Sequence, residues 1–594
     1  IDRREAALTT PDTLLALFPA AIEAAPDAAT RLALAVQRAG LAAHGLALAH
    51  THVRLNSTQV HNALRQRLGI AAAPEDRAAR RGLLTQVKAA LAEVEPVPLD
   101  FGALLSEQAS AVRLVMTCAQ VIKHIDGSQP IRFLIAETET GYTLLAALWL
   151  AKRYGIADRV EISPLFETAD ALERGERVLE EALRSPHFRD YLRRHGRLCL
   201  QFGYSDSGRY VGQLAASYLA ERLKIRLAEQ MRRHGLEGIG RGGHPDSLAD
   251  RFAYLSPPAA RAALAAANLP LREETAFQGG DGYLLFGTER LALATVARIA
   301  EHAFAPPAEA DDPIYAEADW GTDFFATIRR EMATLVEDPG YAALLGAFGP
   351  GLLDKTGSRP AARQADGGGG PVRITHPSQL RAIPNNAILH QMGFLANTLH
   401  GLGAAAAANP EAFADLAVRS PRFARAMAMA QRAAGCSDLG VLRAAVDMLD
   451  PSPWLDRAGF TKRPGRREAL TAVSSALERL GLASATRRMF RRLQADHQAL
   501  RAAWPDLPVM QDRLVLAHAV RLCLAQRLWL LAVSLPEFSP RHGATRDSLV
   551  TRLLQLDVPP VLDLLGEIFP AAPDPSSGLD FGEPAGPREG TSYA

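Results

Sequence analysis

The stretch Leu198-Cys-Leu-Gln-Phe-Gly-Tyr-Ser-Asp-Ser-Gly-Arg209 decides how the central part of this chain folds. Its apolar beginning predicts a short strand, and its small polar residues predict a tight loop. The amphipathic pattern from Val211 to about Arg233 predicts a helix. Asp206 would then stand at the carboxyl end of the strand. In parallel α/β folds, ligands and metal ions bind at this end of the sheet.

The same succession of strand, loop and helix occurs in neighbouring parts of the chain. Ile131–Ala136 and Arg159–Phe166 are apolar runs, and each is followed by a polar, acidic loop and a helical pattern. Leu236–Gly243 and Thr275–Gly287 are two further candidate strands. This recurrence predicts βα units and a parallel sheet.

The composition of the chain limits the kinds of molecule that we expect it to bind. The chain has 594 residues with 66 basic and 65 acidic side chains, and its net charge of +1 favours neither nucleic acid nor an anionic membrane as a partner. Arg521 and Arg527 interrupt the most apolar helical stretch, 514–535, so we expect no helix to span a bilayer. The four cysteines are widely spaced and form no Cys-x-x-Cys pair, which argues against a zinc site or a redox dithiol. A reducing cytoplasm is the simplest compartment for such a chain.

Two carboxylates stand just past the ends of two neighbouring predicted strands. Glu167 follows the strand 159–166, and Asp206 follows the strand 198–202. Oxygen ligands that converge in this way bind Mg²⁺ or Mn²⁺. A second interpretation is local, because an acid at a strand–helix junction also caps the helix and interacts favourably with its dipole. Spacing alone leaves both interpretations open.

Three arginines lie in unusual local contexts. Arg54 follows an apolar segment, Arg241 is flanked by glycines in Gly238-Ile-Gly-Arg-Gly-Gly243, and Arg381 lies in Leu380-Arg-Ala-Ile-Pro384. Glycine lets an anion approach the backbone closely, and a guanidinium group matches phosphate or carboxylate oxygens. In a chain so rich in arginine, surface positions are an equally open interpretation. Gln278 begins a Gly-rich stretch that fits either a phosphate-binding loop or a hairpin turn.

Several motifs, in this order along the chain, resemble those of phosphoenolpyruvate carboxylase. They are Val53-Arg-Leu-Asn-Ser57, Pro164-Leu-Phe-Glu-Thr168, Gly203-Tyr-Ser-Asp-Ser207, Gly240-Arg-Gly-Gly243, Gly357-Ser-Arg-Pro-Ala361 and Leu380-Arg-Ala-Ile-Pro384. The resemblance covers about residues 45–400, whereas 401–570 agree with the family only in being helical. The family's pattern has Lys at the position of Arg209 and Trp at the position of Asn385.

The resemblance implies an α/β but predominantly helical fold. Its centre would be a (β/α)8 TIM-type barrel, incomplete in this chain because the family's N-terminal part is missing, with a large C-terminal helical region. We therefore expect N-terminal helices and a barrel edge in 1–105, the barrel core with metal and anion loops in 106–305, and late barrel motifs with a flexible Gly-rich loop in 306–400. A C-terminal helical region, 401–570, and a disordered tail, 571–594, would follow.

The resemblance also implies roles for individual residues. Glu167 and Asp206 would be the ligands of Mg²⁺ (or Mn²⁺). The substrate-binding residues would be Arg54, Arg381, Arg359 and Gln278, and the catalytic residues would be Arg241 and Arg209.

The implied function is carboxylation of phosphoenolpyruvate with bicarbonate, which gives oxaloacetate and phosphate. The implied protein is a cytoplasmic homotetramer with no nucleic-acid or membrane partner. An alternative is a degenerate homologue that binds phosphoenolpyruvate and a divalent metal without efficient carboxylation, and that acts by hydrolysis or as a sensor. A third possibility, a helical scaffold for protein partners, does not account for the acids and arginines predicted at the ends of the strands.

Overall fold

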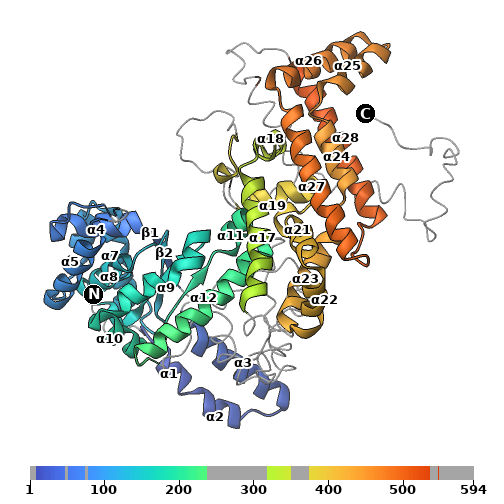
Figure 1. Ribbon diagram of the computed structural model, residues 1–594. Helices are drawn as coiled ribbons and strands as arrows, with labels where there is room; N and C mark the ends of the chain where they lie inside the picture. Colours follow the sequence, from blue (N-terminus) through green and yellow to red (C-terminus); the bar gives the residue numbers. More distant parts are fainter. Residues whose placement is uncertain are drawn as a thin grey trace.

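The structure is a computed structural model, and it describes residues 8–46, 51–73, 76, 78–236, 318–349, 374–380, 382–535 and 546. Within this part, four strands form one parallel sheet in the order β1-β2-β3-β4, and most other residues are helical (Figure 1). The strands are β1 (His52–Asn56), β2 (Ile131–Ala136), β3 (Val160–Phe166) and β4 (Gln201–Phe202). A closed (β/α)8 barrel is not confirmed. The two further predicted strands fall outside the described residues, apart from Leu236.

The βα units predicted for the centre of the chain are present. β2 leads into α8 (Gly141–Arg153), and β3 leads into α9 (Ala169–Leu183). Residues 141–151 are all buried, because α8 packs between the sheet and the neighbouring helices α4, α5 and α9. The strand predicted for Leu198–Phe202 is confirmed only at its last two residues.

The tight loop predicted after this strand is wrong, because the segment is helical. Helix α11 (Tyr204–Val211) begins directly after Gly203, and helix α12 (Gln213–Arg233) follows it. The backbone N–H of Ser207 donates to the Gly203 carbonyl at 2.9 Å, and its hydroxyl donates to the same oxygen at 2.8 Å. The small polar residues therefore form the hydrogen bonds of a helical turn rather than those of a loop. Gly212 separates the two helices with a left-handed φ of 84°.

Gly203 allows α11 to start in direct contact with the end of β3. Its N–H donates to the carbonyl of Phe166 at 2.9 Å. A Cβ atom added at Gly203 would lie 2.5 Å from Cβ and 3.3 Å from Cα of Glu167. Real side chains do not approach so closely, so the position requires glycine for space.

The two faces of the sheet differ in polarity. Paired residues such as Phe133 and Ile162 lie on one face, and Arg132 and Glu161 lie on the other. Arg132 and Glu161 form an ion pair in which both side chains are only 2% exposed. Arg197 also pairs with Glu161. Such a buried pair is costly to break because the remaining charge stays away from water.

The N-terminal half also contains further helices. They are α1 (Asp12–Leu15), α2 (Phe18–Glu23), α3 (Ala28–His44), α4 (Ser57–Leu68), α5 (Arg80–Glu93), α6 (Phe101–Ser106), α7 (Ser110–His124) and α10 (Pro186–His195), with a short 3₁₀ turn, η1 (Ala157–Arg159).

The C-terminal half is helical, as expected for 401–570, over its described residues. Its elements are α17 (Ala318–Val336), α18 (Pro339–Phe348), η2 (Pro377–Gln379), α19 (Ala382–Gln391), α20 (Ala396–Leu399), α21 (Leu402–Ala408), α22 (Pro410–Arg419), α23 (Pro421–Gly435), α24 (Leu439–Asp447), α25 (Pro451–Phe460), α26 (Pro464–Leu480), α27 (Ala483–Ala503) and α28 (Asp512–Ser534).

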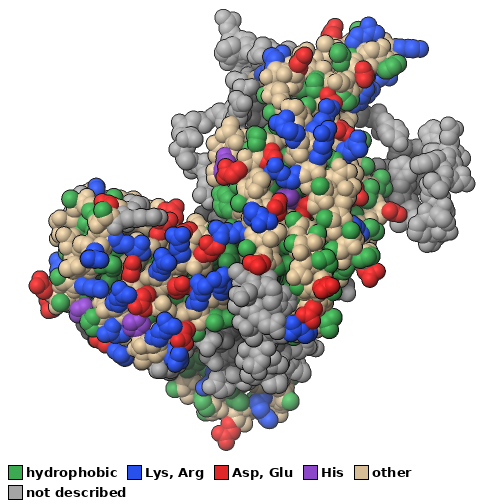
Figure 2. Space-filling model, in the orientation of Figure 1, with side chains coloured by type: hydrophobic (Ala, Val, Ile, Leu, Met, Phe, Trp, Pro, Cys, Tyr) green, Lys and Arg blue, Asp and Glu red, His purple; other side chains and the backbone are tan. Residues whose placement is uncertain are grey.

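Helix α12 belongs to the cores of both halves. Its first residues, Leu214 and Tyr218, pack in the core of the C-terminal helices, and Leu223 and Leu227 pack in the core around the sheet. Figure 1 shows α12 running from the sheet-containing half towards α17. Over the face shown in Figure 2, basic and acidic side chains are interspersed in both halves, in keeping with the net charge of +1.

Helix α28 is the one described helix that is long and apolar enough to cross a membrane by length and composition. This is a weak indication by itself, because core helices of water-soluble proteins meet the same criteria. Polar contacts join α28 to the protein, since Nδ1 of the buried His518 lies 3.2 Å from the carbonyl oxygen of Gln391.

The buried ion pair gives a first prediction. Glu161→Gln should lower the free energy of unfolding by about 3–5 kcal/mol, because the buried guanidinium of Arg132 loses its carboxylate partner. Glu229→Gln is the control, since Glu229 pairs with Arg232 and Arg233 on the surface of α12 and its loss should change stability little. Urea unfolding followed by circular dichroism measures both. Equal stability of the two variants would contradict the prediction.

The contact at Gly203 gives a second prediction. Gly203→Ala should lower the free energy of unfolding by about 1–3 kcal/mol, because the new methyl group overlaps Glu167. Gly82→Ala in α5 is the matched control, since a Cβ atom there meets nothing within 4 Å. Thermal unfolding should show a lower midpoint for the first variant only, and a wild-type midpoint for Gly203→Ala would rule out the close contact.

Candidate functional site

The carboxyl ends of β1 and β3 bring two of the predicted site residues together. Arg54 lies in β1, and Glu167 directly follows β3. Nη2 of Arg54 is 3.9 Å from Oε2 of Glu167, although β2 lies between the two strands. The Arg54 side chain is 56% exposed and that of Glu167 is 15% exposed. At this distance and exposure the ion pair contributes little to the stability of the fold.

Asp206 lies on the element that touches Glu167. Its backbone is in the first turn of α11, and α11 starts at Gly203, against Glu167. The segments that carry the two predicted metal ligands are therefore neighbours. Asp206 is also the third residue of the helix, where an acid interacts favourably with the helix dipole. This position is therefore compatible with the second interpretation of the sequence, that the acid stabilises the start of the helix.

Arg209 lies on the same helix but is completely buried, with 0% exposure. Its Nη1 donates to the carbonyl of Pro377 at 3.2 Å and to that of Leu380, and its Nη2 donates to the hydroxyl of Tyr210 at 2.9 Å. These contacts are with the protein, beside the segment that contains Arg381. A catalytic role for Arg209 stays a prediction.

The other predicted site residues lie outside the described residues. They are Arg241, Gln278, Arg359 and Arg381. Their predicted roles in substrate binding and catalysis stay predictions.

Glu137 is a feature of this rim that the sequence analysis missed. It follows β2 directly, between the strands of Arg54 and Glu167. Its φ of 57° is left-handed, and it is the one such non-glycine residue among those described. Strained backbone of this kind clusters at functional sites. The only signal in the sequence was the acidic loop Glu137-Thr-Glu-Thr140.

Among the described residues, no three His, Cys, Asp or Glu side chains are grouped closely enough to hold a metal ion. The side chain of Asp206 is outside that set. Glu167 offers a carboxylate, which is the hard oxygen ligand that Mg²⁺ and Mn²⁺ prefer, and its side chain is 15% exposed. This one described donor is of the type that suits such an ion.

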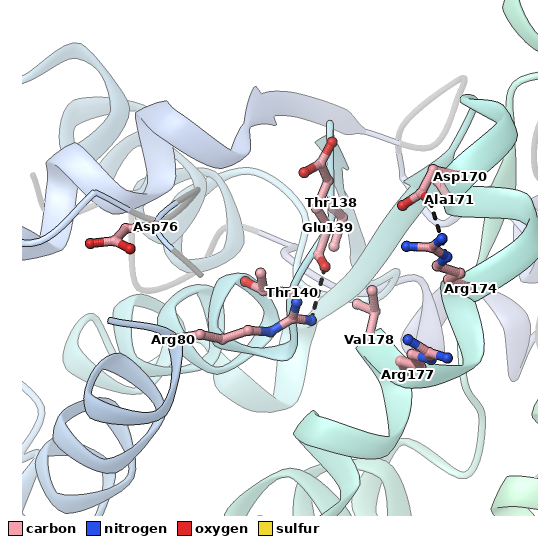
Figure 3. A pocket seen from close by; sticks show the side chains of 10 residues that line it. All are labelled: Asp76, Arg80, Thr138, Glu139, Thr140, Asp170, Ala171, Arg174, Arg177 and Val178. Atoms are coloured by element: carbon pink, nitrogen blue, oxygen red, sulfur yellow. Dashed lines mark hydrogen bonds and ion pairs between the residues drawn. The ribbon is translucent and has the colours of Figure 1, made fainter. Parts of the chain in front are cut away.

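A cavity of about 260 Å³ opens beside this rim (Figure 3). It is lined by the loop after β2, by the start of α5 and by α9. Its charged residues are balanced in sign: Arg80, Arg174 and Arg177 against Asp76, Glu139 and Asp170. Nη2 of Arg80 donates to the backbone carbonyl of Glu139 at 3.2 Å, and Nε of Arg174 lies 3.2 Å from Oδ1 of Asp170. Because the charges balance, the cavity does not select an anion.

Comparison with known proteins gives the same assignment as the motifs. Residues 20–249 match the model of the phosphoenolpyruvate carboxylase family. A phosphoenolpyruvate carboxylase of Corynebacterium diphtheriae is 32% identical over 25% of this chain and 18% of its own length. Enzymes of the same name are 27% identical in Marinobacter nauticus, over 46% of this chain and 30% of the relative, and in Alcanivorax borkumensis, over 63% and 41%.

The chain thus spans less than half of the length of these curated relatives. The matched region contains β1 to β4, both α11 and α12, and the described residues Arg54 and Glu167. The match of residues 20–249 to the family model, together with these relatives, supports membership of the phosphoenolpyruvate carboxylase family.

Proposed function

We propose that this chain binds phosphoenolpyruvate and a divalent cation at the carboxyl ends of β1 and β3, and carboxylates the substrate with bicarbonate. The observation that carries the proposal is the 3.9 Å approach of Arg54 to Glu167, with the first turn of α11 beside them. A cationic fork and carboxylates at one rim suit a phosphorylated substrate and its metal ion. Arg241, Arg359, Arg381 and Gln278 would complete the anion site.

Each described residue has a definite task in this proposal. Arg54 would neutralise and orient the phosphate, because its exposed guanidinium group matches two phosphate oxygens. Glu167 and Asp206 would hold Mg²⁺ or Mn²⁺, which supplies charge stabilisation of the enolate as the phosphoryl group leaves. The C3 carbon then forms the new bond to the carbon derived from bicarbonate, which gives oxaloacetate and phosphate.

One observation favours the alternative, in which the chain binds phosphoenolpyruvate without efficient carboxylation. The family has Lys where this chain has Arg209, and Arg209 is buried against main-chain carbonyls. Arg keeps the positive charge of Lys but, as a residue type, does not give up a proton to act as an acid or base. Hydrolysis would give pyruvate and phosphate, and a sensor would give neither. A cytoplasmic location and homotetrameric assembly are proposed on the family resemblance.

Bicarbonate-dependent formation of oxaloacetate is the direct test. It is followed by coupling to malate dehydrogenase, alongside release of phosphate. We expect Arg54→Ala to raise the KM for phosphoenolpyruvate by about 10- to 150-fold, the factor for loss of a hydrogen bond to a charged group. Arg174→Ala, at the neighbouring cavity, is the control and should leave KM unchanged. Phosphate release with pyruvate in place of oxaloacetate would support the alternative, and neither product with unmeasurable binding would refute both.

Metal binding is tested separately from turnover. Titration of Mn²⁺ followed by electron paramagnetic resonance should show affinity lowered at least about tenfold in Glu167→Gln and in Asp206→Asn, because each variant removes a charged ligand. Asp170→Asn is the matched control, since Asp170 is an exposed acid paired with Arg174 on α9. Wild-type affinity in both ligand variants would remove these residues from the metal site.

A further inference from the structure

Three buried polar residues lie on neighbouring helices of the C-terminal half and α11. They are Arg209 on α11, Tyr341 on α18 and Asn385 on α19, and their exposed fractions are 0%, 1% and 0%. Helix α11 packs against α19, and α18 packs against both α19 and η2. Buried polar groups that find hydrogen-bond partners rigidify the arrangement of the elements that carry them.

Arg209 binds both ends of the short turn η2. One of its acceptors is the carbonyl of Pro377, the first residue of η2, at 3.2 Å, and the other is the carbonyl of Leu380, directly after η2. Its guanidinium carbon lies 4.5 Å from the centre of the Tyr210 ring, and its Nη2 donates to the Tyr210 hydroxyl. A planar fork can reach these acceptors together, whereas the single ammonium group of Lys cannot span them as well.

Tyr341 and Asn385 are buried on two helices that pack against each other, α18 and α19. Burial raises the pKa of Tyr341, and the side chain of Asn385 and the charge of Arg209 oppose that rise. Asn385 is in the first turn of α19, which begins at Ala382. The described elements on either side of residue 381, η2 and α19, both pack against α18, and Arg209 on α11 binds η2.

We infer that Arg209 is a positioning residue, which holds η2 and the adjoining Leu380 in place through the carbonyls of Pro377 and Leu380. Its consequence for substrate binding by the segment that follows η2 rests on the proposed function. Two departures from the family's pattern lie on neighbouring helices. Arg209 stands in place of Lys and Asn385 in place of Trp, and both are buried on helices that pack against each other, α11 and α19.

Hydrogen exchange of the full chain, measured by mass spectrometry, tests this role independently of activity. In Arg209→Met we expect exchange in peptides from 374–391 to rise about 10- to 150-fold, because the charged donor that holds the turn is lost. Arg209→Lys should give a smaller rise in the same peptides. Peptides from β2 and β3 should be unchanged in both variants. Arg113→Met, at an exposed position on α7, is the control and should change nothing.

Unchanged exchange in 374–391 in both Arg209 variants would overturn the inference. If Arg209→Met does not fold, the inference is tested with Arg209→Lys and Asn385→Leu instead. Each of these two variants must raise hydrogen exchange in the peptides from 374–391. A raised KM for phosphoenolpyruvate with little change in kcat is expected in Arg209→Lys. Failure of the wild type to bind phosphoenolpyruvate refutes the proposed function but leaves the exchange test of Arg209 valid.

Discussion

The contact between Gly203 and Glu167 is the constraint on which the candidate site depends. Because residue 203 has no side chain, the first turn of α11 starts directly against the residue that ends β3. Any larger residue would push apart the two segments that carry the predicted metal ligands. Gly203, which the sequence alone places in a loop, is therefore the smallest residue that fits between the end of β3 and the start of α11.

The two ion pairs of this sheet differ in how deeply they are buried, and they therefore differ in what they contribute to the protein. Arg132 and Glu161 are both 2% exposed, so their pairing contributes to the specificity of the fold and neither is available to a ligand. Arg54 and Glu167 lie at the rim of the same sheet, 3.9 Å apart, with side chains 56% and 15% exposed. Depth below the rim, rather than residue type, separates the structural pair from the pair in the candidate site.

The two halves of the molecule are joined through the helices that follow the Gly203 motif. α12 contributes side chains to both hydrophobic cores, and Arg209 on α11 ties the motif to η2. The end of the sheet and η2 are therefore connected through α11. This arrangement explains how motifs far apart in the sequence serve one site in the proposed function.

The sequence by itself determined the βα units at 131–153 and 159–183, because their apolar runs have the lengths and periods of buried strands and helices. Its motifs also pointed to the phosphoenolpyruvate carboxylase family, which the match over residues 20–249 supports. It could not determine that Gly203-Tyr-Ser-Asp-Ser207 begins a helix, because small polar residues satisfy loops and helix starts equally well. Nor could it distinguish exposed Arg54 from buried Arg209. Only tertiary packing decided that, since burial of a guanidinium group depends on carbonyl acceptors that come from a distant segment.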